Sequence, residues 1–249
     1  MDSHFKNKKL YYTNLYDTES KLFRGKDSKG NFRNPFDSLA ATSPMNNPGD
    51  YSEANAGQYF WTPAQYDVKG IIDLLGVKTN FTTQLNTFFT TETENPNMFL
   101  GQEAMIGQYS NGNETSQHIL YLYAYSDSPK ICQKYIYKVI NEFHNNTSDG
   151  MIGNDDCGQM SAWYILSTLG FYPVNPTNGE FILGSPQIKK ATLHLTYKKE
   201  FSIDVKNFSN ENIYNETRFL NNTKLEIPFV SFKEINNGGT LKFEMTKQE

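Results

Sequence analysis

The chain has 249 residues, and its 23 lysines and arginines against 27 aspartates and glutamates give a formal net charge of −4. The sequence has no basic stripe of the kind that binds nucleic acid and no apolar run of the roughly 18 residues that span a membrane. Its N-terminus lacks the apolar stretch of roughly 7–15 residues that marks a signal peptide. We therefore expect one large domain, or one domain with a small appendage, and no export or anchoring signal in the chain as written.

Helical spacing of apolar residues dominates the chain as far as Leu169. Residues 5–22 predict a short helix, and residues 24–50 predict a loop because glycine and proline interrupt them repeatedly. Pro63 is expected at a helix start or break, since an interior proline costs about 3 kcal/mol, and Gly76 and Gly170 are expected to end helices. Further helices are predicted at residues 56–75, 81–89, 116–126, 129–143 and 159–169.

A β-rich segment follows Pro173, where short alternating runs are separated by glycine, asparagine, serine and proline. The expected fold class is therefore mainly α with a β-rich C-terminal part. The boundary is expected near Gly184, which gives regions of residues 1–184 and 185–249. Antiparallel strands are predicted at residues 181–183, 191–195, 201–205, 229–232 and 241–243.

The two cysteines, Cys132 and Cys157, lack CxxC spacing and give no metal signature. Buried free thiols are the expectation, and a disulfide between them stays open.

Three short stretches combine glycine, asparagine or glutamine and carboxylates just before apolar helices. They are E-A-N-A-G-Q-Y at residues 53–59, G-N-E-T-S-Q-H at 112–118 and G-N-D-D-C-G-Q-M-S-A-W at 153–163. Helix capping explains one such residue in each stretch, because Asn, Asp and Ser accept hydrogen bonds from free backbone N–H groups at a helix start. A shared polar site would explain all of them, so both interpretations stay open.

Glu114 and Asp156 are the carboxylates that would carry chemistry if these stretches converge in space. Glycoside hydrolysis uses two carboxyl groups that flank the sugar bond. In an inverting enzyme one group protonates the leaving oxygen and the other activates a water, at a separation of about 6.5–9.5 Å. The two residues are therefore a candidate acid and base pair for a glycosidase.

The same stretches resemble the signatures of glycoside hydrolase family 92. Residues 112–118 resemble its G-N-E-P-S-H-H motif, and residues 153–163 are similar to its G-N-D-D-x-G-Q-M-S-A-W signature. The run L-G-F-Y-P-V at 169–174 and the run G-S-P at 184–186 also match, and the likeness extends from about residue 15 to residue 245.

This resemblance implies a Ca²⁺-dependent, inverting, exo-acting α-mannosidase with an (α/α)6 barrel, of which residues 1–184 would form part. It implies that Glu114 is the general acid and Asp156 the general base. The implied substrate is a mannose-containing glycan, with α-1,2-type linkages in N-glycans or mannans as the expectation. Calcium takes oxygen ligands, although the resemblance assigns none individually. The residues implied to bind substrate or to support the base are Glu53, Asn55, Gln58, Asn113, His118, Asn154 and Asp155.

Three positions depart from the family pattern. Thr115 stands in place of proline, Gln117 in place of the first of two histidines, and Gly57 in place of tryptophan. The histidine and the tryptophan would be sugar contacts, so their replacement bears on substrate preference and activity.

The predicted helices are also too few for a closed barrel, and family members carry an N-terminal β-sandwich before this region. A separately encoded N-terminal half would complete the enzyme. Alternatively, the chain is a catalytically inactive truncated remnant that at most binds sugar or a partner protein.

A different inverting (α/α)6 glycosidase, of the glucoamylase or trehalase sort, is a further alternative that the 153–163 signature disfavours. Chelation by EDTA separates the two, because only the family 92 chemistry depends on calcium. Family members are usually exported, whereas this chain as written predicts a cytoplasmic product.

Overall fold

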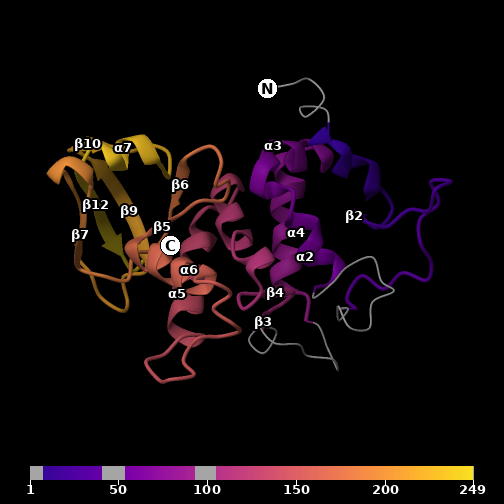
Figure 1. Ribbon diagram of the computed structural model, residues 1–249, viewed down its shortest axis with the longest axis horizontal. Helices are drawn as coiled ribbons and strands as arrows, with labels where there is room; N and C mark the ends of the chain where they lie inside the picture. The colour runs from indigo at the N-terminus through magenta and orange to yellow at the C-terminus, as the bar shows by residue number, and fades with distance from the viewer. Residues whose placement is uncertain (1–7, 41–53, 93–104, 249) are drawn as a thin grey trace. The chain divides into compact units, whose positions relative to one another are not determined.

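The computed structural model describes residues 8–40, 54–92 and 105–248 (Figure 1). Contacts between residues divide the chain into two compact units, Met1–Ser116 and Gln117–Glu249. Each unit is described by itself below. No described helix is long and apolar enough to cross a membrane.

The first unit is built on the helices α2 (Ala56–Trp61), α3 (Ala64–Leu74) and α4 (Lys78–Thr90) (Figure 1). The predicted helix at 56–75 breaks at Pro63, as expected for a residue that cannot donate a backbone hydrogen bond. Gly76 follows α3 with a φ of 91°, which a residue without a side chain adopts easily. The helix predicted at 81–89 is confirmed, and it begins one turn earlier.

The helix predicted over residues 5–22 is wrong for the described residues 8–22. Asp17 accepts hydrogen bonds from the backbone N–H groups of the two residues at positions 19 and 20, and Lys21 adopts a φ of 57°, so the chain turns back instead of continuing as a helix. The segment forms the 3-10 helix η1 (Tyr11–Leu15) and the antiparallel strands β1 (Tyr16–Asp17) and β2 (Leu22–Phe23).

A second short hairpin leads into the 3-10 helix η2 (Glu114–Ser116). Its turn contains Gly107 with a φ of 59°, where an added Cβ would collide with the backbone at the end of α4. The hairpin strands are β3 (Met105–Ile106) and β4 (Tyr109–Ser110).

Aromatic rings fill the core of the first unit. Phe60 on α2 stacks on Phe23 with the ring centroids 5.2 Å apart, and Trp61 meets Phe60 edge on at 4.8 Å. Phe89 on α4 stacks on Tyr109 of β4 at 5.2 Å. Such pairs contribute about 0.5–1.5 kcal/mol beyond the area that they bury. Ring packing therefore holds both hairpins against the helices.

The second unit begins with η3 (Ile119–Tyr125), α5 (Lys130–Glu142) and α6 (Gln159–Leu169). The segment predicted as a helix at 116–126 forms a 3-10 helix, and its residues 119–123 are all buried, so it has no amphipathic face. Pro129, expected at the first position of the next helix, stands one residue earlier as its N-cap. Helix α6 matches its predicted bounds and ends at Gly170, whose φ is 97°.

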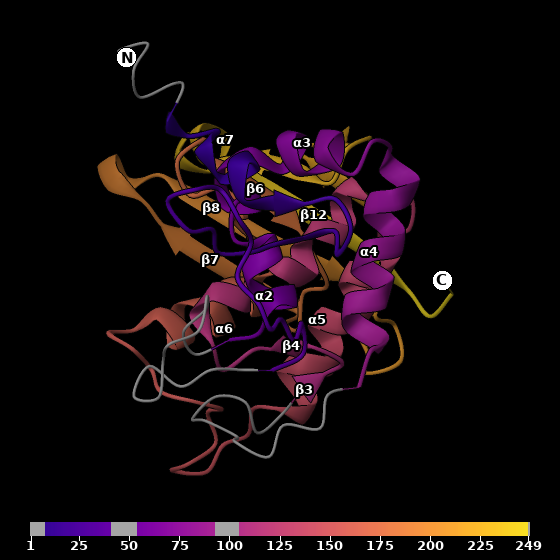
Figure 2. The same cartoon turned by 90° about the vertical axis from the view of Figure 1, so that its right-hand side faces the viewer.

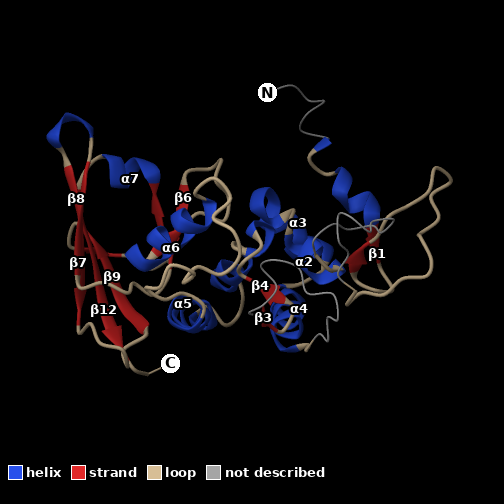
Figure 3. Cartoon of the chain, turned by 60° about the horizontal axis from the view of Figure 1, so that its bottom comes forward, coloured by secondary structure: helices blue, strands red, loops and turns tan. Residues whose placement is uncertain are grey.

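Two sheets complete the second unit (Figure 3). Their order is β11-β6-β5 in the smaller sheet and β10-β9-β12-β8-β7 in the larger one. The smaller sheet contains β5 (Phe171–Tyr172), β6 (Glu180–Leu183) and β11 (Phe229–Ser231). The larger sheet contains β7 (Lys190–His194), β8 (Glu200–Lys206), β9 (Tyr214–Leu220), β10 (Thr223–Lys224) and β12 (Gly239–Thr246), and the short helices beside the two sheets are η4 (Thr196–Lys198) and α7 (Phe232–Asn236).

The expectation of antiparallel strands is wrong for one central pair. Strand β12 lies beside β8 in parallel, with Leu241 opposite Ile203 and Phe243 opposite Val205. Figure 2 shows β7, β8 and β12 as neighbouring ribbons of this sheet. Parallel strands need a long connection, and here it runs through β9 to β11 and α7.

The core of the second unit lies on one face of the larger sheet. Phe201 and Ile203 of β8 and Leu241 and Phe243 of β12 are all fully buried, and the residues between them face outward. This alternation follows the period of two along a strand. The pattern fixes which face of the sheet meets the core and which face remains outside.

The observed class is therefore a set of helices followed by a mixed β-rich part. The boundary expected near Gly184 stays a prediction, and the smaller sheet takes strands from both sides of that residue. Cys132 is buried and free, whereas Cys157 is free but exposed, so burial was predicted correctly for one thiol only.

Candidate active site

Glu114 begins η2 in the first unit and is half-buried. The residue before it, Asn113, is buried, and its Oδ1 accepts hydrogen bonds from the backbone nitrogen of Thr115 at 3.3 Å and from its hydroxyl at 2.9 Å. Asn111 and Ser116 on either side are fully buried. The Glu114 carboxylate is thus presented from a turn whose neighbours are fixed by burial.

Asn55 and Gln58 lie at the start of α2, which packs against η2. The Oδ1 atom of Asn55 accepts a hydrogen bond from the backbone nitrogen of Gln58 at 3.0 Å, so Asn55 is the helix cap. The Gln58 Nε2 donates to the backbone oxygen of Gln108 at 2.8 Å, while its Oε1 is buried with no hydrogen-bond partner among the described residues. One buried carbonyl oxygen therefore remains beside the Glu114 turn.

A cavity of about 310 Å³ lies along the same helix, lined in part by Gly57, Trp61 and Gln108. A side chain at position 57 would collide with the Oε1 atom of Gln108. Glycine inside a helix is unfavourable by roughly 0.5–1 kcal/mol relative to alanine. A larger residue at position 57 would therefore require the Gln108 side chain to move.

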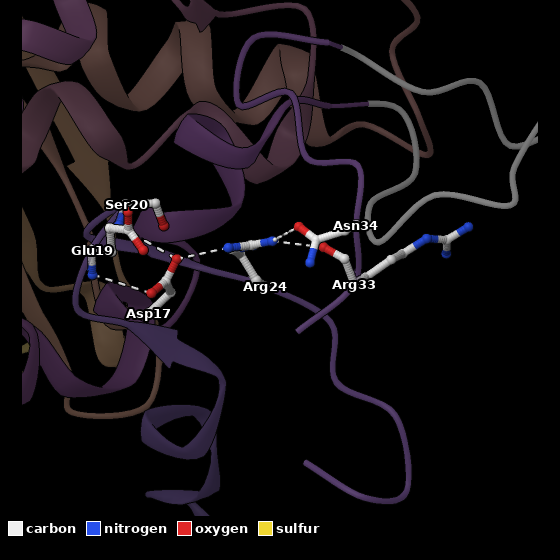
Figure 4. Close-up of polar contacts among 6 residues, drawn as sticks. All are labelled: Asp17, Glu19, Ser20, Arg24, Arg33 and Asn34. Carbon is white, nitrogen blue, oxygen red and sulfur yellow. Dashed lines mark hydrogen bonds and ion pairs between the residues drawn. The ribbon is translucent and has the colours of Figure 1, made fainter. Parts of the chain in front are cut away.

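A buried ion pair missed by the sequence analysis anchors the N-terminal hairpin of the first unit (Figure 4). Arg24 Nη1 lies 2.9 Å from Asp17 Oδ2, and its Nη2 donates to the backbone oxygen of Arg33 and to Asn34 Oδ1. The ring of Phe36 lies 4.3 Å from the guanidinium carbon. The hydrogen bond from Arg24 lowers the pKa of Asp17 to about 2. The sequence offered no signal for this pair beyond two opposite charges seven positions apart.

Asp156 lies in the second unit, in the loop that leads into α6. The φ angles of Asp156, Cys157 and Gly158 are 45°, 61° and 91°, so three consecutive residues are left-handed. Such a conformation costs roughly 1–2 kcal/mol for each residue with a side chain, and strain of this kind concentrates at functional sites. Asp156 is exposed, so its carboxylate is open to solvent.

Asp155 has a different role from its neighbour. Its Oδ1 atom accepts a hydrogen bond from the backbone nitrogen of Ser161 at 3.0 Å, and its backbone oxygen accepts from Gly158 and Met160. The contacts with Ser161 lower the pKa of Asp155. The N-cap residue of α6 is Gly158, and Asp155 caps the helix in the wider sense that it satisfies a free N–H group in the first turn. Asn154 beside it is exposed.

His118 is buried at the start of η3 in the second unit, with 2 % of its surface exposed. Next to it, Gln117 Oε1 accepts a hydrogen bond from Gln159 Nε2 at 3.1 Å, and Trp163 Nε1 donates to the backbone oxygen of Gln117 at 3.2 Å. Trp163 is fully buried, which confirms the prediction of a core position. The residue that departs from the family histidine thus ties η3 to α6.

The expected site residues fall into two groups. The first unit brings together Asn55, Gln58, Asn113 and Glu114, and the second unit holds His118, Asn154, Asp155 and Asp156. Glu53 lies outside the described residues. Capping is realised by Asn55 and Asp155. Within residues 8–40, 54–92 and 105–248, no group of three or more His, Cys, Asp or Glu side chains could hold a metal ion.

Comparison with known proteins places these residues in a family. A solved α-mannosidase of family 92 from Bacteroides thetaiotaomicron, in complex with mannoimidazole, is similar with a TM-score of 0.90 and 37% identity, over 98% of this chain and 32% of that one. A family 92 inverting mannosidase from the same organism gives a TM-score of 0.83 and 31% identity, over 98% and 34% of the two chains.

A curated relative gives the same picture. An uncharacterized secreted glycosidase of Arthroderma benhamiae is 25% identical over 193 residues, which are 76% of this chain and 23% of that protein. The chain thus spans about a third or less of the length of these relatives. The sequence model of the glycosyl hydrolase family 92 catalytic domain matches residues 2–247, and the chain therefore belongs to that family.

Proposed function

We propose that this chain supplies part of the active site of a calcium-dependent, inverting exo-α-mannosidase that removes terminal mannose from N-glycans or mannans, with an α-1,2-type linkage. The observation that carries the proposal is the similarity over 98% of the chain to an α-mannosidase structure that holds mannoimidazole. The inverting outcome is supported by the similar inverting mannosidase.

Glu114 would donate a proton to the glycosidic oxygen, and Asp156 would accept a proton from the attacking water. Their surroundings support this division of roles. Glu114 is half-buried on a turn whose neighbours are buried, which holds its carboxyl group in one place for proton transfer. Asp156 is exposed on a strained loop, which leaves its carboxylate accessible to a water molecule.

For calcium, the first unit offers neutral oxygen donors rather than a cluster of carboxylates. The buried Oε1 atom of Gln58, without a partner among the described residues, is the kind of hard oxygen ligand that Ca²⁺ takes. We therefore name Gln58 as a candidate ligand. The ion would bind mannose hydroxyl groups and favour distortion of the ring, while Gln58 and Asn55 hold the start of α2 in place.

The proposal also includes a partial (α/α)6 barrel formed from the helices of residues 1–184. A separately encoded N-terminal half and the cellular location of the product remain predictions. The catalytically inactive remnant is the alternative function. It is favoured by Gly57 and Gln117, which replace residues that the resemblance implies as sugar contacts.

Hydrolysis of an aryl α-mannoside tests the proposal. The chain would be assayed alone and mixed with the remainder of a family 92 catalytic region, with Ca²⁺ and with EDTA. We expect release of β-mannose as the first product, detected by NMR, and loss of hydrolysis in EDTA. Hydrolysis that persists in EDTA, or α-mannose as the first product, would contradict the proposal. Absence of hydrolysis in every mixture would favour the inactive alternative.

A further inference from the structure

The outer face of the larger sheet in the second unit carries a pocket that the proposed chemistry does not use. It has a volume of about 500 Å³, within the range of roughly 300–1,000 Å³ found for small-ligand sites. Four lysines line it, at positions 189, 190, 206 and 242, together with only two carboxylates, Asp204 and Glu244. The pocket is therefore locally positive on a chain whose net charge is −4.

Strand register aligns four of the pocket residues in one row across the sheet, and the row ends on a lysine outside the pocket. Lys190 on β7 lies opposite Asp204 on β8, which lies opposite Lys242 on β12. Lys242 in turn lies opposite Phe219 on β9, and Phe219 lies opposite Lys224 on β10. One half-buried aromatic ring therefore lies between two lysines on the face that points away from the core.

Two of the lysines have no carboxylate partner among the described residues. Lys206 Nζ lies 3.0 Å from Glu244 Oε1, and Lys190 Nζ lies 3.7 Å from Asp204 Oδ1. By contrast, Lys242 Nζ donates only to Asn222 Oδ1, at 3.2 Å, and Lys189 forms no ion pair within the part of the chain that the structure describes. These two ammonium groups keep their charge available for a ligand.

We propose that this pocket is an accessory binding site for an anionic glycan, a sugar chain that bears phosphate or carboxylate groups. Lys189 and Lys242 would contact the anionic group, Asn222 would orient Lys242, and the ring of Phe219 would support a sugar face. Nucleic acid suits the pocket less well, because Asp204 and Glu244 interrupt the positive charge. The sugar part of this proposal rests on the proposed function, and the charge part does not.

Affinity electrophoresis of the full chain tests binding without requiring catalysis. Gels would contain a phosphorylated mannan, a polygalacturonate or a neutral mannan, and the two charged polymers distinguish phosphate from carboxylate. We expect retardation by at least one charged polymer and little by the neutral one. Retardation should disappear in about 1 M salt, where the Debye length falls to about 3 Å.

Substitutions identify the pocket as the binding surface. Each of Lys189→Gln and Lys242→Gln should weaken binding about fivefold, because one ammonium–anion contact at about 4 Å in water has roughly that effect. Phe219→Ala should weaken it roughly two- to tenfold. Lys138→Gln, on α5 and outside the pocket, is the matched control and should leave binding unchanged. Circular dichroism would verify that each variant keeps its fold.

Three outcomes would overturn the proposal. They are unchanged retardation of the Lys189→Gln, Lys242→Gln double variant, equal retardation by neutral mannan, and equally tight binding of duplex DNA in a competition experiment. None of them bears on mannoside hydrolysis, so the accessory site and the proposed catalytic function can fail separately.

Discussion

Different interactions stabilise the interior of each of the two units. Each unit carries one of the two candidate catalytic carboxylates. The first unit relies on stacked aromatic rings and on the Asp17–Arg24 ion pair, and it presents Glu114 from a turn with buried neighbours. The second unit relies on an apolar sheet core, and it presents Asp156 from an exposed left-handed loop. Acid should therefore lower the stability of the first unit. Removal of apolar side-chain volume should lower the stability of the second.

The largest expected effect is on the rate of hydrolysis, and it distinguishes the roles of two neighbouring carboxylates in the second unit. Asp156→Asn should lower kcat for α-mannoside hydrolysis about 10²- to 10⁴-fold, the usual contribution of a general base, and should leave the melting temperature unchanged. Asp155→Asn weakens the acceptor that caps α6, so it should lower the melting temperature and reduce kcat less. A larger loss of rate for the Asp155 variant would reverse the assignment of the two residues.

The next effect measures the sheet core. Ile203 is fully buried between β7 and β12, so Ile203→Ala should lower the free energy of unfolding by about 2–5 kcal/mol. Ser202→Ala, on the outer face of the same strand, should change it by less than about 0.5 kcal/mol. Urea denaturation followed by tryptophan fluorescence gives both values. Equal effects of the two substitutions would show that the sheet core does not dominate the second unit.

A smaller effect tests the polar anchor of the first unit. Asp17→Asn removes a hydrogen-bonded charge and should lower the free energy of unfolding by about 1.5–3 kcal/mol. The pKa of Asp17 is about 2 in the folded chain, below its ordinary value of 3.8. Its stabilisation is therefore complete above about pH 4 and is lost as the pH falls toward 2. Asp73→Asn, in an exposed pair with Lys69, is the control and should change little. If Asp17→Asn were as stable as the parent at pH 7, the pair with Arg24 would not stabilise the first unit.

The smallest effect concerns the helix start beside the Glu114 turn. Asn55→Ala removes the cap of α2 and should cost about 0.5–2 kcal/mol, whereas Asn55→Ser keeps an acceptor and should cost much less. Thermal unfolding of both variants gives the comparison. If Asn55→Ser were as unstable as Asn55→Ala, side-chain packing rather than capping would explain Asn55.

Local signals predicted much of the fold. Helix α6 was predicted at its exact bounds because a polar stretch precedes it and Gly170 ends it. Strands β9 and β10 were missed because the residues around them are rich in asparagine, which is typical of loops. Asn221 and Asn222 form the turn between the two strands, and both adopt positive φ. The parallel pairing of β12 with β8 joins segments that are far apart in sequence, so no local pattern could indicate it.

The candidate site was predictable as a set of motifs but not as a set of roles. The G-N-D-D stretch could not show which aspartate caps α6, because that depends on the left-handed turn at Asp156. Likewise, the buried Oε1 atom of Gln58 and the ion pair of Arg24 depend on partners that only the folded chain brings together.

The leaving-group dependence of the Glu114→Gln and Asp156→Asn variants tests the central claim most directly. Hydrolysis rates would be compared for an activated aryl α-mannoside and for an unactivated mannobiose. A missing general acid matters most when the leaving group is poor, so Glu114→Gln should lose far more rate on mannobiose than on the aryl substrate, and Asp156→Asn should lose similar factors on both. Equal losses on both substrates for Glu114→Gln would contradict its role as the proton donor.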